Sequence, residues 1–259
     1  KKLFSVFITL CMIFTMLPVN VFAAGETMQI EVKTDRTGPL KTGDTVTMTL
    51  NIKAPVGLSG IQATVASDND NLKIAEKTDV SNTLPTGTYV SVAPSLADAK
   101  ICSVIGTYAT GLDVALDGDY VVAKYTATAD IDVPVKFTFS AVKVVFGVAG
   151  GATTVTPTGK MEAMVDVALT GDLPVAITAP VKGGTPETTI TGTNYTGSIT
   201  WTPTDTGGKF AANTAYTANV TLTAKEGYQF AGDVNPTVAG ATRVTNVNVK
   251  NSGKTLEFK

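Results

Sequence analysis

The stretch Thr45–Lys53, TVTMTLNIK, decides the fold, because apolar and polar residues alternate along it without interruption. In an extended chain, successive side chains point to opposite faces, so its four apolar residues share one face. These are Val46, Met48, Leu50 and Ile52. A period of two over this length predicts a β-strand with one buried face, which requires a second sheet to cover it.

The same period recurs on both sides of this stretch. The further candidate strands are MQIEVKT, GIQATVA, NLKIAE, TYVSVA, KICSVIGTY, YVVAKYTATA, VPVKFTFSAVKVVF and MEAMVDVAL. Turn-forming clusters such as TGPLKTGD, SDNDN and ALDGD separate them. About nine short strands without an amphipathic helix predict an all-β domain, an antiparallel immunoglobulin-like sandwich over residues 24–170.

Composition excludes several classes of function. Charged residues make up 16% of the chain and the formal net charge is −2, so there is no electrostatic footprint for nucleic acid. Histidine is absent, which removes the commonest general base and the commonest transition-metal ligand. No nucleophile, base or cofactor signature is present, and the sequence therefore predicts a protein that is not an enzyme and has no cofactor.

The N-terminal segment has the pattern of a secretory signal peptide. Lys1 and Lys2 precede an apolar run, and Val21-Phe22-Ala23 provides a small-residue cleavage site. We expect residues 1–23 to be removed, and no second membrane span follows. Cys11 leaves with the leader, so Cys102 stands alone, and its alternation with Val104 predicts a small buried residue. A disulfide-free exported chain fits a bacterial cell-surface protein.

A second, smaller domain follows a change in pattern. The segment 171–182, within TGDLPVAITAPVKGGTPE, is rich in Pro and Gly and is predicted to be a linker. Alternation resumes over residues 183–259, in TTITGTN, TGSITWTP, AYTANVTLTA and YQF, and ends in the hairpin RVTNVNVKNSGKTLEF with a turn at Asn251-Ser252-Gly253. These five or six strands predict a small β-sandwich.

Two acidic clusters are weak candidates for calcium binding. Asp68 and Asp70 lie in SDNDNLKI, and Asp117 and Asp119 lie in LDGDY. Calcium takes six to eight oxygen ligands, but the spacing of a calcium-binding loop and its terminal bidentate Glu are missing. Asp and Asn also form turns unaided, through side-chain bonds to their own backbone, and this interpretation is the better one.

The aromatic residues raise the alternative of a carbohydrate-binding module that attaches to polysaccharide. Its candidate platforms are Trp201, Tyr195, Tyr216, Tyr228, Tyr89, Tyr108, Tyr120 and Tyr125. In NYTGSITWTP, residues 194–203, Trp201 is in phase with Ile199 and out of phase with the neighbouring threonines. That phase places the indole in the core of the second domain, and most of the tyrosines likewise alternate in phase with aliphatic residues.

Two stretches of the first domain resemble cohesins, the sandwich modules of cellulosomal scaffoldins. In KTGDTVTMTLNIKAPVGLSGIQATVASDNDNLKI the family pattern is matched by Gly43-Asp44, Gly60-Ile61-Gln62, Asp68 and Leu72-x-Ile74. Ser67 and Asn69 stand where the family has Tyr and Pro. LDGDYVVAKYTATADIDVPVKFTFSAVKVV is similar to the late strands of the family. The resemblance implies a nine-stranded jelly roll, no catalysis, and recognition of a dockerin-like protein partner on one sheet face.

The second domain resembles a module repeated in large surface proteins of Firmicutes-type bacteria. APVKGGTPETTITGTNYTGSITWTP, FAANTAYTANVTLTAKEGYQFAG and VAGATRVTNVNVKNSGKTLEF carry this resemblance. It implies a spacer or adhesive module. Together the two domains predict a secreted, non-catalytic scaffolding or adhesive protein of the bacterial cell surface, and the binding residues themselves are not assigned by the sequence.

Overall fold

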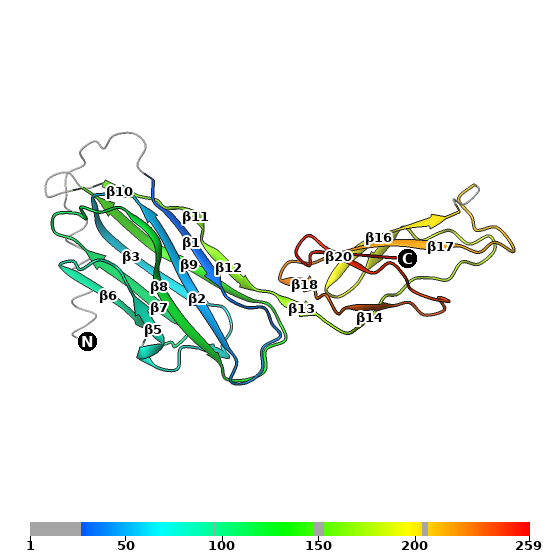
Figure 1. Ribbon diagram of the computed structural model, residues 1–259, viewed down its shortest axis with the longest axis horizontal. Helices are drawn as coiled ribbons and strands as arrows, with labels where there is room; N and C mark the ends of the chain where they lie inside the picture. Colours follow the sequence, from blue (N-terminus) through cyan, green and yellow to red (C-terminus); the bar gives the residue numbers. More distant parts are fainter. Residues whose placement is uncertain (1–26, 96, 148–152, 204–206) are drawn as a thin grey trace. The chain divides into compact units, whose positions relative to one another are not determined.

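The computed structural model describes residues 27–95, 97–147, 153–203 and 207–259 (Figure 1). The predicted signal peptide and Cys11 lie outside these residues. The chain divides into two compact units, which we describe separately. Within the described residues, the first unit comprises 27–36, 40–131 and 135–165, and the second comprises 37–39, 132–134 and 166–259.

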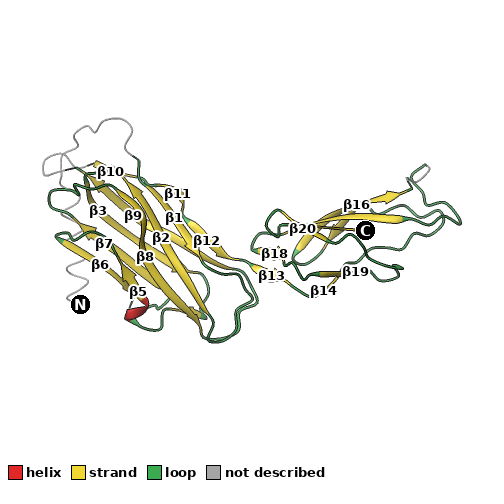
Figure 2. Cartoon of the chain, viewed as in Figure 1, coloured by secondary structure: helices red, strands yellow, loops and turns green. Residues whose placement is uncertain are grey.

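The first unit is a sandwich of two sheets, as the alternating sequence predicts (Figure 2). One sheet has the strand order β11-β1-β2-β8-β4, with β5 also pairing with β8. Its strands are β1 (Gln29–Thr34), β2 (Thr45–Ala54), β4 (Leu72–Lys73), β5 (Val80–Asn82), β8 (Leu116–Ala127) and β11 (Thr158–Lys160). Neighbours are antiparallel except β1 and β11, which pair in parallel.

The other sheet of the first unit has the order β10-β9-β3-β7-β6, with β12 also pairing with β9, and all of its pairs are antiparallel. Its strands are β3 (Leu58–Ser67), β6 (Tyr89–Pro94), β7 (Ile101–Thr107), β9 (Val135–Phe146), β10 (Thr153–Val155) and β12 (Glu162–Val165). The short 3-10 helix η1 (Lys77–Asp79) precedes β5. Strands form in every stretch where the sequence predicts one, and β5, β10 and β11 are additional short strands.

The core of the first unit lies between these two sheets. The apolar residues of Thr45–Lys53 are fully buried, which confirms the predicted phase of this strand. Cys102 and Val104 are buried from the opposite sheet, also as predicted. Tyr125 and Phe137 meet edge to face across the core, with ring centroids 4.9 Å apart. Aromatic pairs in this geometry stabilise a core beyond the area that they bury.

The second unit is smaller and its two layers are unequal. A five-stranded sheet has the order β15-β16-β17-β21-β20. Its strands are β15 (Thr189–Thr191), β16 (Tyr195–Thr202), β17 (Thr217–Ala224), β20 (Asn248–Lys250) and β21 (Thr255–Phe258). Two parallel ladders add β13 (Val167–Leu169) with β18 (Tyr228–Phe230), and β14 (Asp172–Pro174) with β19 (Asn235–Thr237). The predicted turn at residues 251–253 joins β20 to β21, with positive φ at each of its three residues.

The start of the second unit differs from the predicted boundary at residue 170. The last continuous part of the second unit begins at Asp166, and the segment 171–182 contributes β14. The cause is backbone pairing with strands about sixty residues further along the chain, because β13 and β14 find their partners in β18 and β19. No described helix has the length and apolarity that crossing a membrane requires.

Candidate interaction surface

The outer face of the β10-β9-β3-β7-β6 sheet consists mostly of small, uncharged side chains. Register places these residues side by side on neighbouring strands, with Thr64 opposite Ser103 and Ala66 opposite Ile101. Ile105 lies between Gln62 on β3 and Ser91 on β6. The outward side chains of β3 and β7 are half-buried; these are Gln62, Thr64, Ala66, Ile101, Ser103 and Ile105. Small residues such as Ala66 and Ser103 therefore lie beside larger ones such as Ile101 and Ile105 on this face.

Apolar side chains and a few charged ones interrupt this flat surface. Val145 is only 5% exposed although it lies outside the main core cluster, because it packs on the outer face opposite Gly60. A shallow hollow forms there, lined among others by Ile105, Val145 and Lys143. At one edge Lys136 contacts Glu162, with Nζ and Oε2 3.1 Å apart. The face therefore combines an apolar centre with charged groups beside it.

The outer face of the opposite sheet has a different chemistry. Threonine and charged residues alternate outward along β1, β2 and β8; the charged ones include Glu31, Lys33, Lys53, Asp117, Asp119 and Lys124. Several are paired on the surface: Lys33 contacts Glu31 at 3.2 Å and Lys53 contacts Asp117 at 3.2 Å. Exposed pairs of this kind contribute little to stability but keep a face well hydrated. The half-buried Val122 also lies on this face, opposite Thr49 on β2 and Ser81 on β5.

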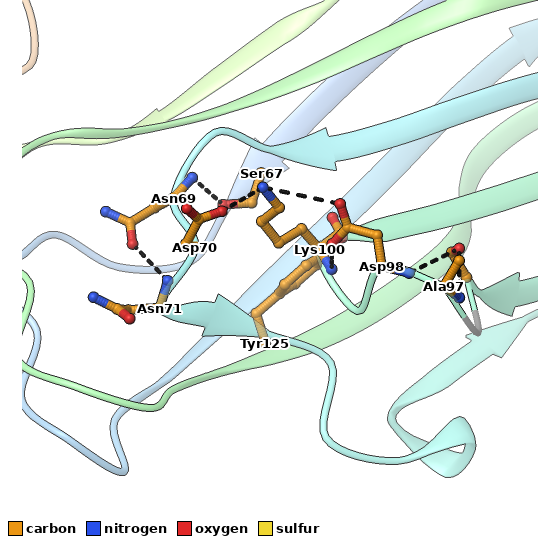
Figure 3. Close-up of polar contacts among 9 residues, drawn as sticks. Ser67, Asn69, Asp70, Asn71, Ala97, Asp98, Lys100 and Tyr125 are labelled. Carbon is orange, nitrogen blue, oxygen red and sulfur yellow. Dashed lines mark hydrogen bonds and ion pairs between the residues drawn. The ribbon is translucent and has the colours of Figure 1, made fainter.

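The first pair of calcium candidates lies in a turn whose polar atoms have partners within the chain (Figure 3). Ser67 Oγ accepts from the Asn69 backbone N–H, and Asn69 Oδ1 accepts from the Asn71 backbone N–H at 2.9 Å. Asp68 Oδ1 accepts from the Lys136 backbone N–H at 2.9 Å. The Lys100 ammonium donates to Asp70 and lowers the pKa of that carboxyl. Ser67 and Asn69 thus form local turn bonds, whereas the Asp68 and Asp70 carboxylates bind Lys136 and Lys100, which are distant in the sequence.

The second pair of calcium candidates is far from the first. Leu72 pairs with Ala127 at one end of β8, whereas Asp117 lies at the other end of that strand, roughly 30 Å away at the usual rise per residue. Asp117 pairs with Lys53, and Asp119 accepts a hydrogen bond from Asn51 Nδ2 at 2.7 Å. In the described part of the chain, no three Asp, Glu, Cys or His residues gather as metal ligands would.

Most of the aromatic candidates are withdrawn from the surface. Tyr125, Tyr108 and Tyr195 are buried, and Tyr89 is the exposed one, at 52%. The others are half-buried; these are Tyr120, Tyr216, Tyr228 and Trp201. The described aromatic side chains of the first unit therefore form no open platform for a sugar ring. Cys102 is also fully buried, and this burial raises the pKa of its thiol to about 12.

Trp201 lies where the sequence phase predicts but is less deeply buried than a core residue. Ile199 is buried in the core of the second unit, whereas the indole packs against that core from its edge. Its Nε1–H donates to the backbone oxygen of Glu187 at 2.8 Å, and its ring meets Phe210 edge to face. The polar end of the indole is thus satisfied while part of the ring remains accessible.

Some residues of these surfaces were not singled out by the sequence analysis. Ile101 and Ile105 are out of phase with Cys102 and Val104, so the alternation in KICSVIGTY already placed them on the outer face. For Lys143 and Val145 no comparable signal exists, because the register of β9 against β3 shifts at two irregularities. Arg243, which lines a groove in the second unit, lies outside any strand and carried no periodic signal.

Comparison with known proteins relates the fold to one group of solved structures. No family model matches the chain, and no curated protein matches it in sequence. Among the solved structures that it resembles is the type I cohesin–dockerin complex Coh-OlpC–Doc435 from Clostridium thermocellum, with 14% identity, 56% of this chain and 96% of that chain covered, and a TM-score of 0.43.

Two further solved structures are cohesins from other organisms. For a type II cohesin from the cellulosome of Acetivibrio cellulolyticus the identity is 16%, the coverage 54% of this chain and 95% of that chain, and the TM-score 0.41. A non-cellulosomal cohesin from Archaeoglobus fulgidus is 12% identical, with 52% of this chain and 88% of that chain covered and a TM-score of 0.38. At these identities the likeness concerns the fold. Cohesins are also the family that the motifs of the first domain resemble.

Proposed function

We propose that this chain is a non-catalytic, exported bacterial surface protein whose first unit recognises a protein partner. The recognition surface is the outer face of the β10-β9-β3-β7-β6 sheet. The observation that carries the proposal is the contrast between the two outer faces of the sandwich. One has small residues around Ile105 and Val145, whereas the other has threonines and paired charges around Val122. A partner gains most by covering the face that is less well hydrated.

The chemistry of this face suits a protein partner better than a small ligand. Half-buried residues such as Thr64, Ser103 and Ile105 are already partly withdrawn from water, so covering them costs little desolvation. The hollow at Ile105 and Val145 is too small to hold a ligand, so recognition there requires a partner with a broad complementary surface. Lys143 and the Lys136–Glu162 pair supply charges that orient such a partner.

The partner that we propose is a dockerin-like pair of helices. This choice rests on the cohesin motifs in the sequence, which imply protein recognition on one sheet face. Two of the similar solved structures are complexes of type I cohesins with dockerins from Clostridium thermocellum. The export signal proposed at residues 1–23 agrees with a function outside the cell. The absence of histidine and of any nucleophile–base signature in the sequence agrees with binding rather than catalysis.

The test compares the two outer faces directly. The full chain is titrated with a panel of dockerin modules, including Doc435, by isothermal titration calorimetry. Thr64→Arg places a large charge in the centre of the proposed face, and we expect at least a tenfold loss of affinity. Thr49→Arg makes the same change on the outer face of the opposite sheet and is expected to bind like the original chain. Absence of heat with every dockerin, or equal loss in both variants, contradicts the proposal.

A further inference from the structure

The second unit contains a groove of about 480 Å³ that the proposed function does not use. Its floor is the inner face of the five-stranded sheet, where Trp201, Ala218 and Phe258 lie. Two segments form its walls, residues 177–180 on one side and 238–246 on the other. The volume falls within the usual range for sites that bind small molecules.

The groove exists because the layer opposite the sheet ends early. β14 and β19 run in parallel, and their last backbone bond joins Val175 N–H to the Thr237 oxygen. A tight turn follows at once, in which the Ala241 N–H donates to the Val238 oxygen. Gly240 has φ +79° at its third position, a conformation that glycine adopts without steric cost. The turn diverts the second wall from the first and leaves the sheet uncovered between them.

Aromatic and aliphatic side chains give the groove an apolar lining held in place by the fold. Trp201 is fixed by its bond to Glu187 and by Phe210, and the Tyr216 ring also packs edge to face on Phe210. The Tyr216 hydroxyl accepts a hydrogen bond from the Ala211 N–H at 2.9 Å. Rings fixed in this way lose little conformational freedom when a ligand packs on them. The C–H face of a pyranose ring is an apolar surface of matching kind.

The polar part of the lining is cationic and rich in donors. Arg243 and Lys259 line the groove, and no Asp or Glu is among the described residues that do. Thr178, Thr242 and Asn246 add hydroxyl and amide groups. Thr242 and Arg243 are both exposed on this wall. The Arg243 guanidinium favours a ligand that carries a carboxylate, which accepts two parallel bonds from Arg.

We propose that this groove binds a carboxylated saccharide, with sugar rings against the aromatic lining and the carboxylate at Arg243. The bounded volume and the hydroxyl-rich rim favour a sugar over an extended peptide, because strand addition needs a long free sheet edge. The site lies entirely within the second unit. Its success or failure is therefore independent of protein recognition by the first unit.

The single tryptophan of the chain makes the test direct, because Trp201 lines the groove. The full chain is titrated with trigalacturonic acid and with a glucuronate-containing hyaluronan tetrasaccharide, while Trp201 emission is recorded. We expect a saturable change with at least one of them. Cellotriose, which lacks the carboxylate, should bind at least tenfold more weakly. No change with either acidic sugar, or tighter binding of triglutamate than of both, overturns the proposal.

A pair of charge-removing variants tests the role assigned to Arg243. Arg243→Gln removes the guanidinium from the exposed wall and should weaken binding of the acidic sugar at least tenfold, with cellotriose unaffected. Lys182→Gln removes an exposed cation of the same unit that does not line the groove, and it should bind as the original chain does. Unchanged melting temperatures establish that both variants are folded. If the Arg243→Gln variant binds the acidic sugar as tightly as the original chain does, the role assigned to Arg243 is wrong.

Discussion

The two units differ in how completely their layers cover each other. In the first, two sheets of six strands each bury a common core from both sides. In the second, a five-stranded sheet faces two short ladders, and the covering layer stops at Val175 and Thr237. The inner face near Trp201 and Ala218 is consequently accessible.

This difference separates the two kinds of binding that the chain can support. Where the layers match, every inward side chain is used for packing, so recognition is left to the outer faces and to partners with broad surfaces. Where one layer is shorter, the inner face itself becomes the wall of a groove, which suits a small ligand. Core substitutions should therefore act on stability alone in the first unit, and on both stability and binding in the second.

The largest effect is expected from removing a fully buried side chain of the first unit's core. Phe137 is fully buried and packs edge to face on Tyr125, so Phe137→Ala should lower the free energy of unfolding of the first unit by about 3–5 kcal/mol. Reaction of Cys102 with a thiol reagent, in a Cys11→Ser background under increasing urea, measures this directly, because the thiol is buried. The urea concentration at which half of Cys102 becomes labelled should be lower in the Phe137→Ala variant.

A matched substitution at the surface of the same unit provides the control. Val56 is 52% exposed, and Val56→Ala should change the free energy of unfolding by less than about 0.5 kcal/mol. Trp201 emission reports unfolding of the second unit, because Trp201 packs on that unit's core. The urea midpoint of this transition should be unchanged in Phe137→Ala and in Val56→Ala. Rapid labelling of Cys102 in the original chain without urea would show that the first core is not closed.

A smaller loss of stability is expected at the edge of the open core. Trp201 packs against the second core while part of the ring remains accessible, so Trp201→Ala should cost about 2–3 kcal/mol, less than for a fully buried ring. Trp201→Phe keeps an aromatic ring but removes the donor to Glu187, and should cost about 1 kcal/mol. Differential scanning calorimetry measures both, and an unchanged second transition for Trp201→Ala would contradict this assignment.

The strands of both units were predictable because their signal is local. Alternation in Thr45–Lys53 fixed which side chains face inward, and the phase of Trp201 with Ile199 was also correct. The depth of Trp201 was not predictable, since it depends on where the opposite layer stops. That layer is built from β14 and β19, whose residues are about sixty positions apart and carry no periodic pattern. A Pro- and Gly-rich segment therefore looked like a linker while it forms part of the groove wall.

The same argument explains which surface residues the sequence could indicate. Ile101 and Ile105 alternate with the inward-facing Cys102 and Val104 and therefore lie on the outer face. Arg243 and Thr178 line the same groove only because two irregular segments diverge after Val175 and Thr237. No spacing rule connects residues brought together in this way. Sites on regular strands are visible from alternation, whereas a groove between irregular segments requires the folded chain.

The smallest predicted effect concerns one carboxylate that holds the groove wall. Glu187 accepts from both the backbone N–H and the hydroxyl of Thr178, at 2.8 Å each, and these bonds lower the pKa of its carboxyl below the ordinary 4.5. A lowered pKa in the folded chain means that the bonds stabilise the wall above pH 4.5 and are lost as the pH falls below it. The amide NMR signal of Thr178 should therefore shift with a midpoint below 4.5, and Glu187→Gln should abolish this titration. A midpoint at or above 4.5, or a titration that survives the substitution, would mean that the wall is not held by this carboxylate. The predicted titration, by contrast, would mean that a single exposed side chain sets the shape of a binding site in the second unit.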